Sequence, residues 1–334
     1  MKDRITISDI AKLANVSKTT VSFYLNGHHY KMSEETKNRI REVIETTGFQ
    51  PSTVARSLNA KQTYLLGVLI SDITSAFANQ LIKGLTEYVQ QRGYQLILGS
   101  SSFRNENERK CIEGMYNMGV DGFLVQPSPQ FESMWDTMGI DKPLVFFDSP
   151  PRDTSVMYVK TDSYQAVYEA IRTTVKKGYT HFAVVTADPE TVITRQERMG
   201  GFRDCLNAYG LDYDTIPAER DTSLPALREA LAPLIARYEN LCVFAVNNWL
   251  LKKVFLALED FRHLIPQKLG LLGMDAYEWN YLVVPPITTI LQPAEEEGVA
   301  AGKLLIDAIE RKNGEEHTCI LKCKINEQAS TARQ

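Results

Sequence analysis

The sequence predicts a small all-α head followed by a larger α/β core of two lobes, each a doubly wound parallel sheet. Three observations carry this prediction. The first 62 residues show short amphipathic patterns with helical spacing. From residue 64 onward, short apolar runs alternate with segments of helix length. About eight such units are more than one ordinary doubly wound sheet contains, which favours two lobes.

Length and composition agree with a soluble globular protein of two or three domains. The chain has 334 residues, of which 44% are hydrophobic and 23% are charged. No run approaches the ~20 apolar residues of a membrane span, and the first residues lack the apolar core of a signal peptide. The five cysteines are odd in number and mostly lie in apolar runs, which favours reduced core thiols. We therefore expect a cytoplasmic protein.

Charge is divided unevenly along the chain. Residues 1–62 hold ten Lys and Arg against six Asp and Glu, a net charge of +4. The remaining 272 residues hold 27 against 35, a net charge of −8. A small basic head on an acidic core indicates that the head, and not the core, meets a polyanion.

The first helix of the head is expected to begin after Thr6. Thr6 and Asp9 have the spacing of a capping box, in which an acid three residues on bonds back to the N-cap. Ile10, Leu13 and Ala14 then form the expected apolar stripe.

Two further helices follow in the head, and a short helical piece after them. Ser17 is placed to cap a helix from residue 18 to about 25, which the pair Asn26-Gly27 ends. Another helix begins at Ser33 and stops at Gly48. A last short helical piece is expected at residues 52–60, after Pro51.

The first two helices have the arrangement of a helix-turn-helix. Such a unit places the start of its second helix in the major groove of DNA, where side chains reach base edges. Val21 and Leu25 face inward on that helix, and its outward face carries Lys18, Thr19, Ser22 and Phe23. On periodicity alone, a three-helix module that binds another protein remains an alternative.

The core is read from two alternating sets of segments. Its strand-like runs are residues 65–70, 95–99, 122–126, 143–147, 182–186, 242–246, 269–274 and 287–291, with a last strand-like segment at 319–325. Its helix-length segments are residues 76–92, 106–118, 164–177, 197–209, 224–238, 249–261 and 294–311. Alternation of this kind is typical of parallel sheets covered by helices.

Candidate ligand-binding residues follow from this topology, because α/β sheets bind ligands beyond the carboxyl ends of their strands. Arg195 and Arg198 lie at the start of a helical segment, and Phe77 and Trp249 can supply an apolar or stacking wall. Polar side chains directly follow the apolar runs at Asp148, Asn247, Asn248, Asp275 and Gln292. Carboxylates, amides and guanidinium groups together suit the hydroxyls and ring oxygen of a small polar ligand.

Catalysis is the rival interpretation of these residues. Asp148 and Asp275 could form a glycosidase pair. No phosphate-binding glycine loop, metal-spaced His/Cys cluster or nucleophile elbow accompanies them in the sequence. We therefore expect no enzyme activity, no metal and no cofactor.

The head closely resembles the lactose-repressor/galactose-repressor (LacI/GalR) family. Residues 7–27 read ISDIAKLANVSKTTVSFYLNG, and the stretches SEETKNRI at 33–40 and GFQPSTVARSL at 48–58 resemble the third helix and hinge helix of that family. The resemblance implies a dimer whose heads bind the major groove of a near-palindromic operator. It also implies that paired hinge helices enter the minor groove, where Leu58 would act as an apolar wedge.

The residues expected to contact DNA come from these matching positions. Many relatives carry Arg at the position of Phe23, so this chain departs from the family there. The expected contacts are Thr6, Ser17, Lys18, Thr19, Ser22, Phe23, Asn26, Ala55 and Leu58.

From about residue 64 the core resembles the periplasmic-binding-protein-like core of the same family. Asn248 and Ala294 depart from residues common in relatives, which leaves the effector's identity open. The residues at matching effector positions are Ser75, Phe77, Asp148, Arg195, Arg198, Asn247, Trp249, Asp275 and Gln292.

The expected domains are a head at 1–50, a hinge and linker at 51–63, and a core at 64–334. Within the core we expect an N-lobe of about 64–161 and 293–321 and a C-lobe of about 162–290 and 322–334.

The sequence thus predicts a ligand-responsive repressor of carbohydrate or sugar-acid genes. Its expected partners are double-stranded operator DNA, a sugar, sugar acid or sugar phosphate, and a second copy of the chain, with no membrane contact. The chain ends soon after the segment 319–325 without a heptad tail, so we expect dimers and not tetramers. A nucleobase-responsive corepressor-type regulator and a sugar receptor without DNA function remain the alternatives.

Phe23 generates a testable prediction about operator preference. A phenyl ring cannot make the paired hydrogen bonds that Arg makes to guanine, but it can pack on a thymine methyl. We expect A·T at the base pair that Phe23 touches, and Phe23→Arg should shift preference toward guanine there by roughly 1–3 kcal/mol. Binding-site selection with both variants measures the shift.

The alternative is that Phe23 packs against Tyr24 and Tyr30 and covers the helix bundle. An unchanged half-site together with a large loss of head stability would support that alternative.

Overall fold

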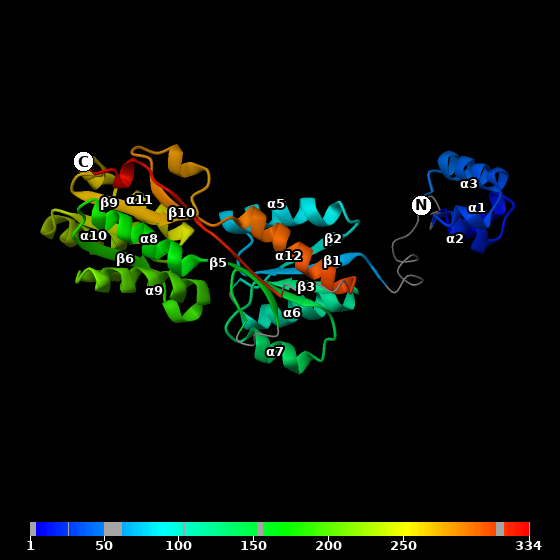
Figure 1. Ribbon diagram of the computed structural model, residues 1–334, viewed down its shortest axis with the longest axis horizontal. Helices are drawn as coiled ribbons and strands as arrows, with labels where there is room; N and C mark the ends of the chain where they lie inside the picture. Colours follow the sequence, from blue (N-terminus) through cyan, green and yellow to red (C-terminus); the bar gives the residue numbers. More distant parts are fainter. Residues whose placement is uncertain are drawn as a thin grey trace. The chain divides into compact units, whose positions relative to one another are not determined.

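The computed structural model describes residues 5–25, 27–49, 62–102, 104–151, 156–311 and 317–333. The chain forms two compact units that divide between Thr63 and Tyr64 (Figure 1). Within the described ranges, no helix has both the length and the apolar character needed to cross a membrane.

The head consists of α1 (Ile7–Leu13), α2 (Lys18–Leu25), the short 3-10 helix η1 (His29–Lys31) and α3 (Glu34–Thr47). The Asp9 carboxylate accepts a hydrogen bond from the Thr6 amide at 2.9 Å, as the capping box predicts. Ser33 caps α3 by accepting from the Thr36 amide, and Gly48 ends that helix at φ +62°. The expected hinge at 52–60 lies outside the described residues.

The apolar core of the head is built from all three helices. Ile10, Val21 and Ile40 are fully buried. The prediction that Leu13 belongs to the buried stripe is wrong, because Leu13 is the last residue of α1 and is 61% exposed. Ala11, two residues before the end of α1, is buried in its place.

The N-lobe contains a six-stranded sheet in the order β11-β5-β4-β3-β1-β2, parallel throughout. Its strands are β1 (Leu65–Ile70), β2 (Gln95–Ser100), β3 (Gly122–Val125), β4 (Leu144–Phe147), β5 (Met157–Thr161) and β11 (Thr318–Leu321). Its helices are α5 (Ala76–Gln90), α6 (Asn105–Asn117), α7 (Phe131–Met138) and α12 (Ala294–Ile309).

The C-lobe contains a second six-stranded sheet in the order β12-β10-β9-β8-β6-β7, parallel except for the edge strand β12. Its strands are β6 (His181–Thr186), β7 (Tyr213–Pro217), β8 (Leu241–Ala245), β9 (Leu269–Met274), β10 (Thr288–Leu291) and β12 (Lys324–Asn326). Its helices are α8 (Ser163–Lys176), α9 (Ile193–Ala208), α10 (Leu224–Arg237) and α11 (Asn248–Ala257), with 3-10 turns η2 (Pro189–Thr191), η3 (Glu259–Leu264), η4 (Trp279–Tyr281) and η5 (Ala329–Thr331).

The chain passes between the two lobes three times. It leaves the N-lobe after β5, returns from β10 to α12, and leaves again between β11 and β12. The first and third passages bond to each other, since the Asp162 backbone amide donates to the Leu321 carbonyl at 2.9 Å and the Asp162 carboxylate accepts from the Cys323 amide at 2.7 Å.

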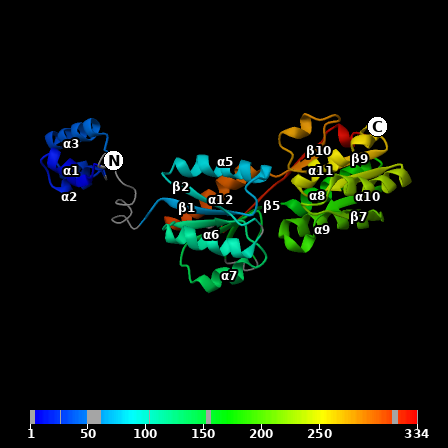
Figure 2. The same ribbon diagram turned by 180° about the vertical axis from the view of Figure 1, so that it is seen from behind.

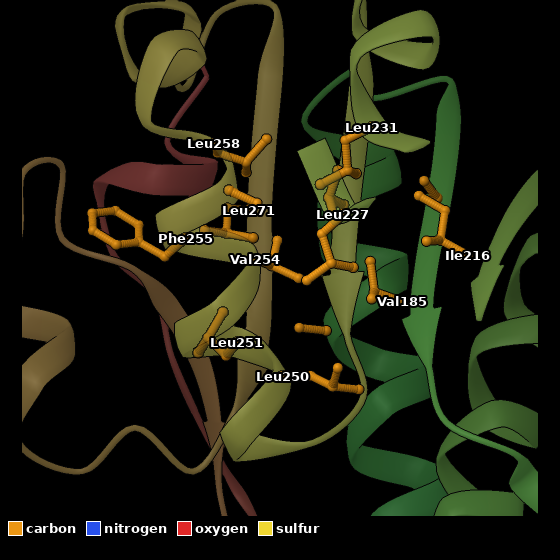
Figure 3. Close-up of a cluster of buried hydrophobic side chains, with 14 of the residues drawn as sticks. Val185, Ile216, Leu227, Leu231, Leu250, Leu251, Val254, Phe255, Leu258 and Leu271 are labelled. Atoms are coloured by element: carbon orange, nitrogen blue, oxygen red, sulfur yellow. The ribbon is translucent and has the colours of Figure 1, made fainter. Parts of the chain in front are cut away.

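Each sheet is buried on both faces, as parallel sheets with crossover helices require. In the N-lobe, α5 and α12 lie side by side on one face, and α6 and α7 cover the other (Figures 1 and 2). In the C-lobe, Val185 and Leu271 point into the cluster with α10 and α11 (Figure 3), while Val184 and Leu272 point into the cluster with α8 and α9. Neighbouring residues of one strand thus face opposite helices.

Several elements differ from the sequence-based expectation. β5, β7 and α7 were not predicted, because they are short and carry polar residues among their apolar ones. The expected strand at 319–325 is two strands, β11 and β12, which belong to different sheets. Cys319 therefore lies in the N-lobe sheet, and Cys323 lies in the passage between the lobes.

The helices α5 and α12 approach each other closely at two glycines. A Cβ atom on Gly84 would lie 2.1 Å from the Glu295 carbonyl oxygen, and one on Gly298 would lie 2.2 Å from the Leu81 carbonyl oxygen. Both distances are far below any real contact and involve backbone, so the helices can pack this way only with glycine at these positions.

This contact predicts that Gly298→Ala destabilises the core. The added methyl group forces α5 and α12 apart, so we expect the free energy of unfolding to fall by about 1–3 kcal/mol. Chemical denaturation followed by tryptophan fluorescence measures it. The matched control is Gly114→Ala in α6, where a Cβ meets nothing within 4 Å. That variant should be neutral or up to about 1 kcal/mol more stable; equal stability of the two variants would contradict the prediction.

Candidate functional site

Polar residues from both sheets gather where the strands end. Asp148 follows β4 in the N-lobe, while Asn247, Asp275 and Gln292 follow β8, β9 and β10 in the C-lobe. The carboxyl ends of the parallel strands in both lobes face one cavity. Because ligands bind beyond the carboxyl ends of parallel strands, both lobes point to this one cavity as the ligand site.

All nine residues predicted to bind an effector line this one cavity, which has a volume of about 80 Å³. We call it the inner cavity. Whether the nine contact an effector remains a prediction. The complete lining is Asp72, Ser75, Phe77, Gln126, Asp148, Val192, Thr194, Arg195, Arg198, Arg220, Asn247, Asn248, Trp249, Asp275 and Gln292.

The side-chain amide of Gln292 connects the two lobes inside the cavity. Its Oε1 accepts from Arg198 Nη2 of the C-lobe at 2.6 Å. Its Nε2 donates to Asp148 Oδ1 at 3.3 Å and to Thr161 Oγ1 at 3.1 Å, both in the N-lobe sheet region. An amide suits this place, because it offers an acceptor to one lobe and two donors to the other.

Asp148 is held from three directions. Its backbone has φ +63°, in the left-handed region that non-glycine residues seldom adopt. Its amide donates to Glu297 Oε1 at 2.6 Å, and its carboxylate accepts from Gln126 Nε2 at 2.7 Å as well as from Gln292. These bonds aim the carboxylate at the cavity and stabilise the strained backbone.

Glu297 is a fully buried acid in the first turn of α12. Burial raises the pKa of its carboxyl well above the usual range, and the nearby Asp148 and Asp275 carboxylates raise it further, while Arg198 opposes this. Burial therefore favours the protonated form of the Glu297 carboxyl in the folded chain.

Asp275 also lines the inner cavity and directly follows β9 in the C-lobe. Its Oδ1 accepts from the backbone amide of Gln292 at 2.9 Å and from the Tyr277 hydroxyl at 3.1 Å. Burial raises the pKa of the Asp275 carboxyl to about 6, although the Arg198 guanidinium and these hydrogen bonds lower it. The group is mostly ionised at pH 7.

The arginines of α9 are both buried and fixed by backbone carbonyls. Arg198 Nη1 donates to the Val246 carbonyl at 3.2 Å, and its Nε has no hydrogen-bond partner. Arg195 donates to the Asp188 carbonyl and, through Nε at 3.3 Å, to Asn247 Oδ1. The unpartnered Arg198 Nε is a buried donor beside the cavity, and such a group favours an oxygen-bearing ligand.

An ion pair between the lobes stands beside the aromatic wall of the cavity. Arg220 Nη2 of the C-lobe contacts Asp72 Oδ2 of the N-lobe at 2.5 Å. The Arg220 guanidinium lies 5.3 Å from the centre of the Trp249 ring, and Lys253 donates to the Arg220 carbonyl. This contact joins the lobes at the inner cavity.

Sequence reasoning missed several of these residues. Asp72 and Gln126 follow strands β1 and β3, so the strand-end rule could have found them. Glu297 had a weaker signal, an acid on the buried face of α12 that carries Ala294 and Ala301. Arg220 lies in a polar loop after β7, and no pattern in the sequence distinguishes it.

In the head, the structure places the predicted DNA contacts around the start of α2. Lys18 and Thr19 are exposed, and Ser22 is half-buried. Two predicted contacts also serve as helix caps: the Thr6 hydroxyl donates to Asp9 at 2.6 Å, and Ser17 Oγ accepts from the Thr20 amide at 3.0 Å. Asn26, Ala55 and Leu58 lie outside the described residues.

Phe23 lies on α2 outside the buried core of the head, and its side chain is half-buried. Its ring packs edge to face on His28, with centroids 6.3 Å apart, and His28 packs in the same way on Tyr30. The Lys31 ammonium lies 4.4 Å from the Phe23 centroid. Contact of Phe23 with base edges remains a prediction, and Lys31 brings a positive charge to the same surface.

A helix-turn-helix head joined to a two-lobed core with a polar cavity defines a class of ligand-responsive, DNA-binding transcription regulators. The head carries a LacI family domain, because residues 6–52 match the model of the LacI family of bacterial regulatory proteins, and residues 171–331 match the model of a periplasmic binding protein-like domain. This family consists of transcription regulators.

Known relatives align over nearly the whole chain. The ribose operon repressor of Escherichia coli K12 is 29% identical over 316 residues, which cover 91% of this chain and 93% of that protein. The lac repressor dimer bound to operator and the anti-inducer ONPF superposes with a TM-score of 0.84 at 17% identity, covering 98% of this chain and 99% of that one. The CelR–cellobiose complex gives a TM-score of 0.68 at 23% identity, covering 98% and 100%.

The buried acid predicts a pH dependence of stability. The folded chain holds the Glu297 proton to higher pH than the unfolded chain, which loses it near pH 4.3. The free energy of unfolding therefore falls as pH rises from about 4.3 toward the raised pKa of the folded carboxyl, by at most about 1.4 kcal/mol per pH unit. Glu297→Gln should flatten this fall, most clearly above about pH 7, where the Asp275 carboxyl is already mostly ionised. Thermal unfolding, followed at a series of pH values, measures this pH dependence of stability. Glu296→Gln, exposed in the same turn, should keep the parent slope; a parental slope in Glu297→Gln would contradict the prediction.

Proposed function

We propose that this chain is a homodimeric, ligand-controlled repressor of carbohydrate or sugar-acid utilisation genes that acts in the cytoplasm. Its head binds operator DNA, and its core binds a sugar, sugar acid or sugar phosphate. The observation that carries the proposal is the inner cavity, where nine residues predicted from separate parts of the sequence converge.

The chemistry of the cavity supports a saccharide. Two carboxylates, Asp148 and Asp275, accept hydrogen bonds from hydroxyls, and Arg198 and Asn247 donate them. Phe77 and Trp249 offer apolar surface for the CH face of a ring. A ribose operon repressor and a CelR–cellobiose complex among the similar proteins agree with this class of ligand.

Ligand binding would act by changing the angle between the lobes. The cavity has walls in both lobes, so a ligand that bonds to Asp148 and Arg198 together favours one lobe arrangement over others. The three passages between the lobes, of which the first and third are joined at Asp162, would transmit this change toward the linker and the head. For this mechanism we propose a division into a head at 1–50, a hinge at 51–63 and a core at 64–334.

A surface of the C-lobe supports the proposed dimer. Leu282 and Val284 are 82% and 83% exposed in one short segment after η4, beside the half-exposed Tyr281. Adjacent exposed apolar side chains of this size are typical of protein interfaces. Sedimentation of the full chain should give the dimer mass.

The test combines ligand screening with operator release. Sugars, sugar acids, sugar phosphates and purines are screened by thermal shift, because a ligand of the folded state raises the unfolding temperature. The ligand found should change operator affinity by about 5- to 150-fold in a fluorescence anisotropy titration. Arg198→Ala should abolish this response and leave operator binding without ligand largely unchanged.

The control variant is Arg203→Ala, an exposed arginine of the same helix, which should respond like the parent chain. Loss of both ligand response and operator binding in Arg198→Ala would show Arg198 to be structural. Stabilisation by purines alone would support a nucleobase-responsive regulator, and ligand binding without operator binding would support a receptor.

A further inference from the structure

The aromatic wall that Trp249 offers to a ligand is already covered by cations. The Arg220 guanidinium lies over the Trp249 ring at 5.3 Å from its centre, and the Lys253 ammonium lies over the same ring at 5.8 Å. The face of an aromatic ring attracts cations, and it is also the surface that the CH groups of a sugar ring contact. Arg220 and Trp249 line the same cavity, so a ligand stacked on this ring competes with Arg220.

Arg220 is held over the ring by a residue of the other lobe. Its Nη2 pairs with Asp72 Oδ2 at 2.5 Å, and Asp72 follows β1 in the N-lobe. The Asp72 carboxylate is fixed in turn, because its Oδ1 accepts from the Thr74 amide at 3.0 Å and from the Thr74 hydroxyl at 2.6 Å. The same guanidinium thus covers Trp249 and ties the C-lobe to the N-lobe.

The inner cavity is small while Arg220 stays in this position. It encloses about 80 Å³, whereas ligand sites usually enclose about 300–1,000 Å³. A larger cavity of about 430 Å³ adjoins it in the same cleft, but neither Trp249 nor Arg198 lines that larger cavity. A ligand that contacts both of these residues must therefore enlarge the inner cavity.

Arg220 is the lining side chain that can leave at the lowest cost. Among the described residues that line the inner cavity, it alone is exposed, and the others are buried or half-buried. Its backbone is fixed separately, because Lys253 Nζ donates to the carbonyls of Arg220 and Thr222. The guanidinium can therefore turn toward water while the turn after β7 keeps its place.

We propose that Arg220 is an autoinhibitory residue of the effector site. It covers Trp249 and holds the N-lobe through Asp72 until a ligand takes its place on the ring. The displaced guanidinium leaves Asp72, so the same movement that admits the ligand breaks an ion pair between the lobes. Ligand binding is coupled to the lobe arrangement in this way, because the ligand and the ion pair exclude each other. The inference rests on the proposed function and adds a residue that lowers the affinity of its site.

The test compares the full parent chain with Arg220→Ala by isothermal titration calorimetry. The probes are ribose, glucose, galactose, gluconate and glucose 6-phosphate, which represent the sugars, sugar acids and sugar phosphates of the proposed function. Arg220→Ala uncovers Trp249 and removes the ion pair, but it keeps the backbone carbonyl to which Lys253 donates. We expect at least one probe to bind this variant about 3- to 30-fold tighter than the parent chain, the combined range of an exposed ion pair and a cation–π contact.

A second ion pair between the lobes supplies the matched control. Lys160 of β5 pairs with Glu197 of α9, and neither residue lines the inner cavity. Glu197→Gln breaks this ion pair without changing the cover on Trp249, so its affinity for the probes should equal that of the parent chain. Asp72→Asn releases Arg220 and keeps a side chain of the same shape. It should bind the same probe tighter than the parent chain but less tightly than Arg220→Ala.

Three outcomes overturn the inference. Equal or weaker binding of every probe to Arg220→Ala would show that Arg220 is neutral or contacts the ligand, and the proposed function would stand. A gain in Glu197→Gln as large as that in Arg220→Ala would show that any loosening of the lobes suffices, and the proposed function would again stand. If no probe binds either the parent chain or Arg220→Ala, the inference is refuted; the proposed function fails as well only if the wider screen finds no ligand.

Discussion

The hydrogen bonds of the Gln292 side chain are the interaction on which the arrangement of the core depends. Gln292 lies where the chain leaves the C-lobe sheet and enters α12 of the N-lobe. Its amide accepts from Arg198 on one side and donates to Asp148 and Thr161 on the other. One side chain thus fixes the passage and two cavity walls, so a change in the angle between the lobes must rearrange these bonds.

This arrangement places several charges in a buried region. Arg198 lies near Asp275 and Asp148, and burial raises the pKa of the neighbouring Glu297 carboxyl well above its usual range. A buried charge is costly unless it is paired and hydrogen-bonded. The hydrogen bonds among these groups are incomplete, because Arg198 Nε and Glu297 Oε2 have no hydrogen-bond partner. Such incomplete satisfaction is expected where a polar ligand completes the network, and it separates this region from the apolar clusters on the sheet faces.

The sequence predicted the core and most of the inner cavity because strand ends are visible as polar residues after apolar runs. Asp148, Asn247 and Asp275 were found in this way, and the family resemblance added Ser75. Arg220 was not found, since its place beside Trp249 depends on how a polar loop folds back on the lobe. β7 was missed for a related reason: an edge strand needs few apolar residues, and its partner β6 supplies the pairing.

The three passages between the lobes have a consequence for recombination between related genes. The head is continuous in sequence and separates from the core at one point, between Thr63 and Tyr64, so a single crossover exchanges an entire head. Each lobe is assembled from separate stretches of chain. A single crossover inside the core therefore combines segments from two parent proteins within one sheet, or on opposite sides of the cleft. Operator preference can therefore be acquired as a block, whereas a new ligand preference has to arise by substitutions in the cavity walls or by inheritance of the whole core.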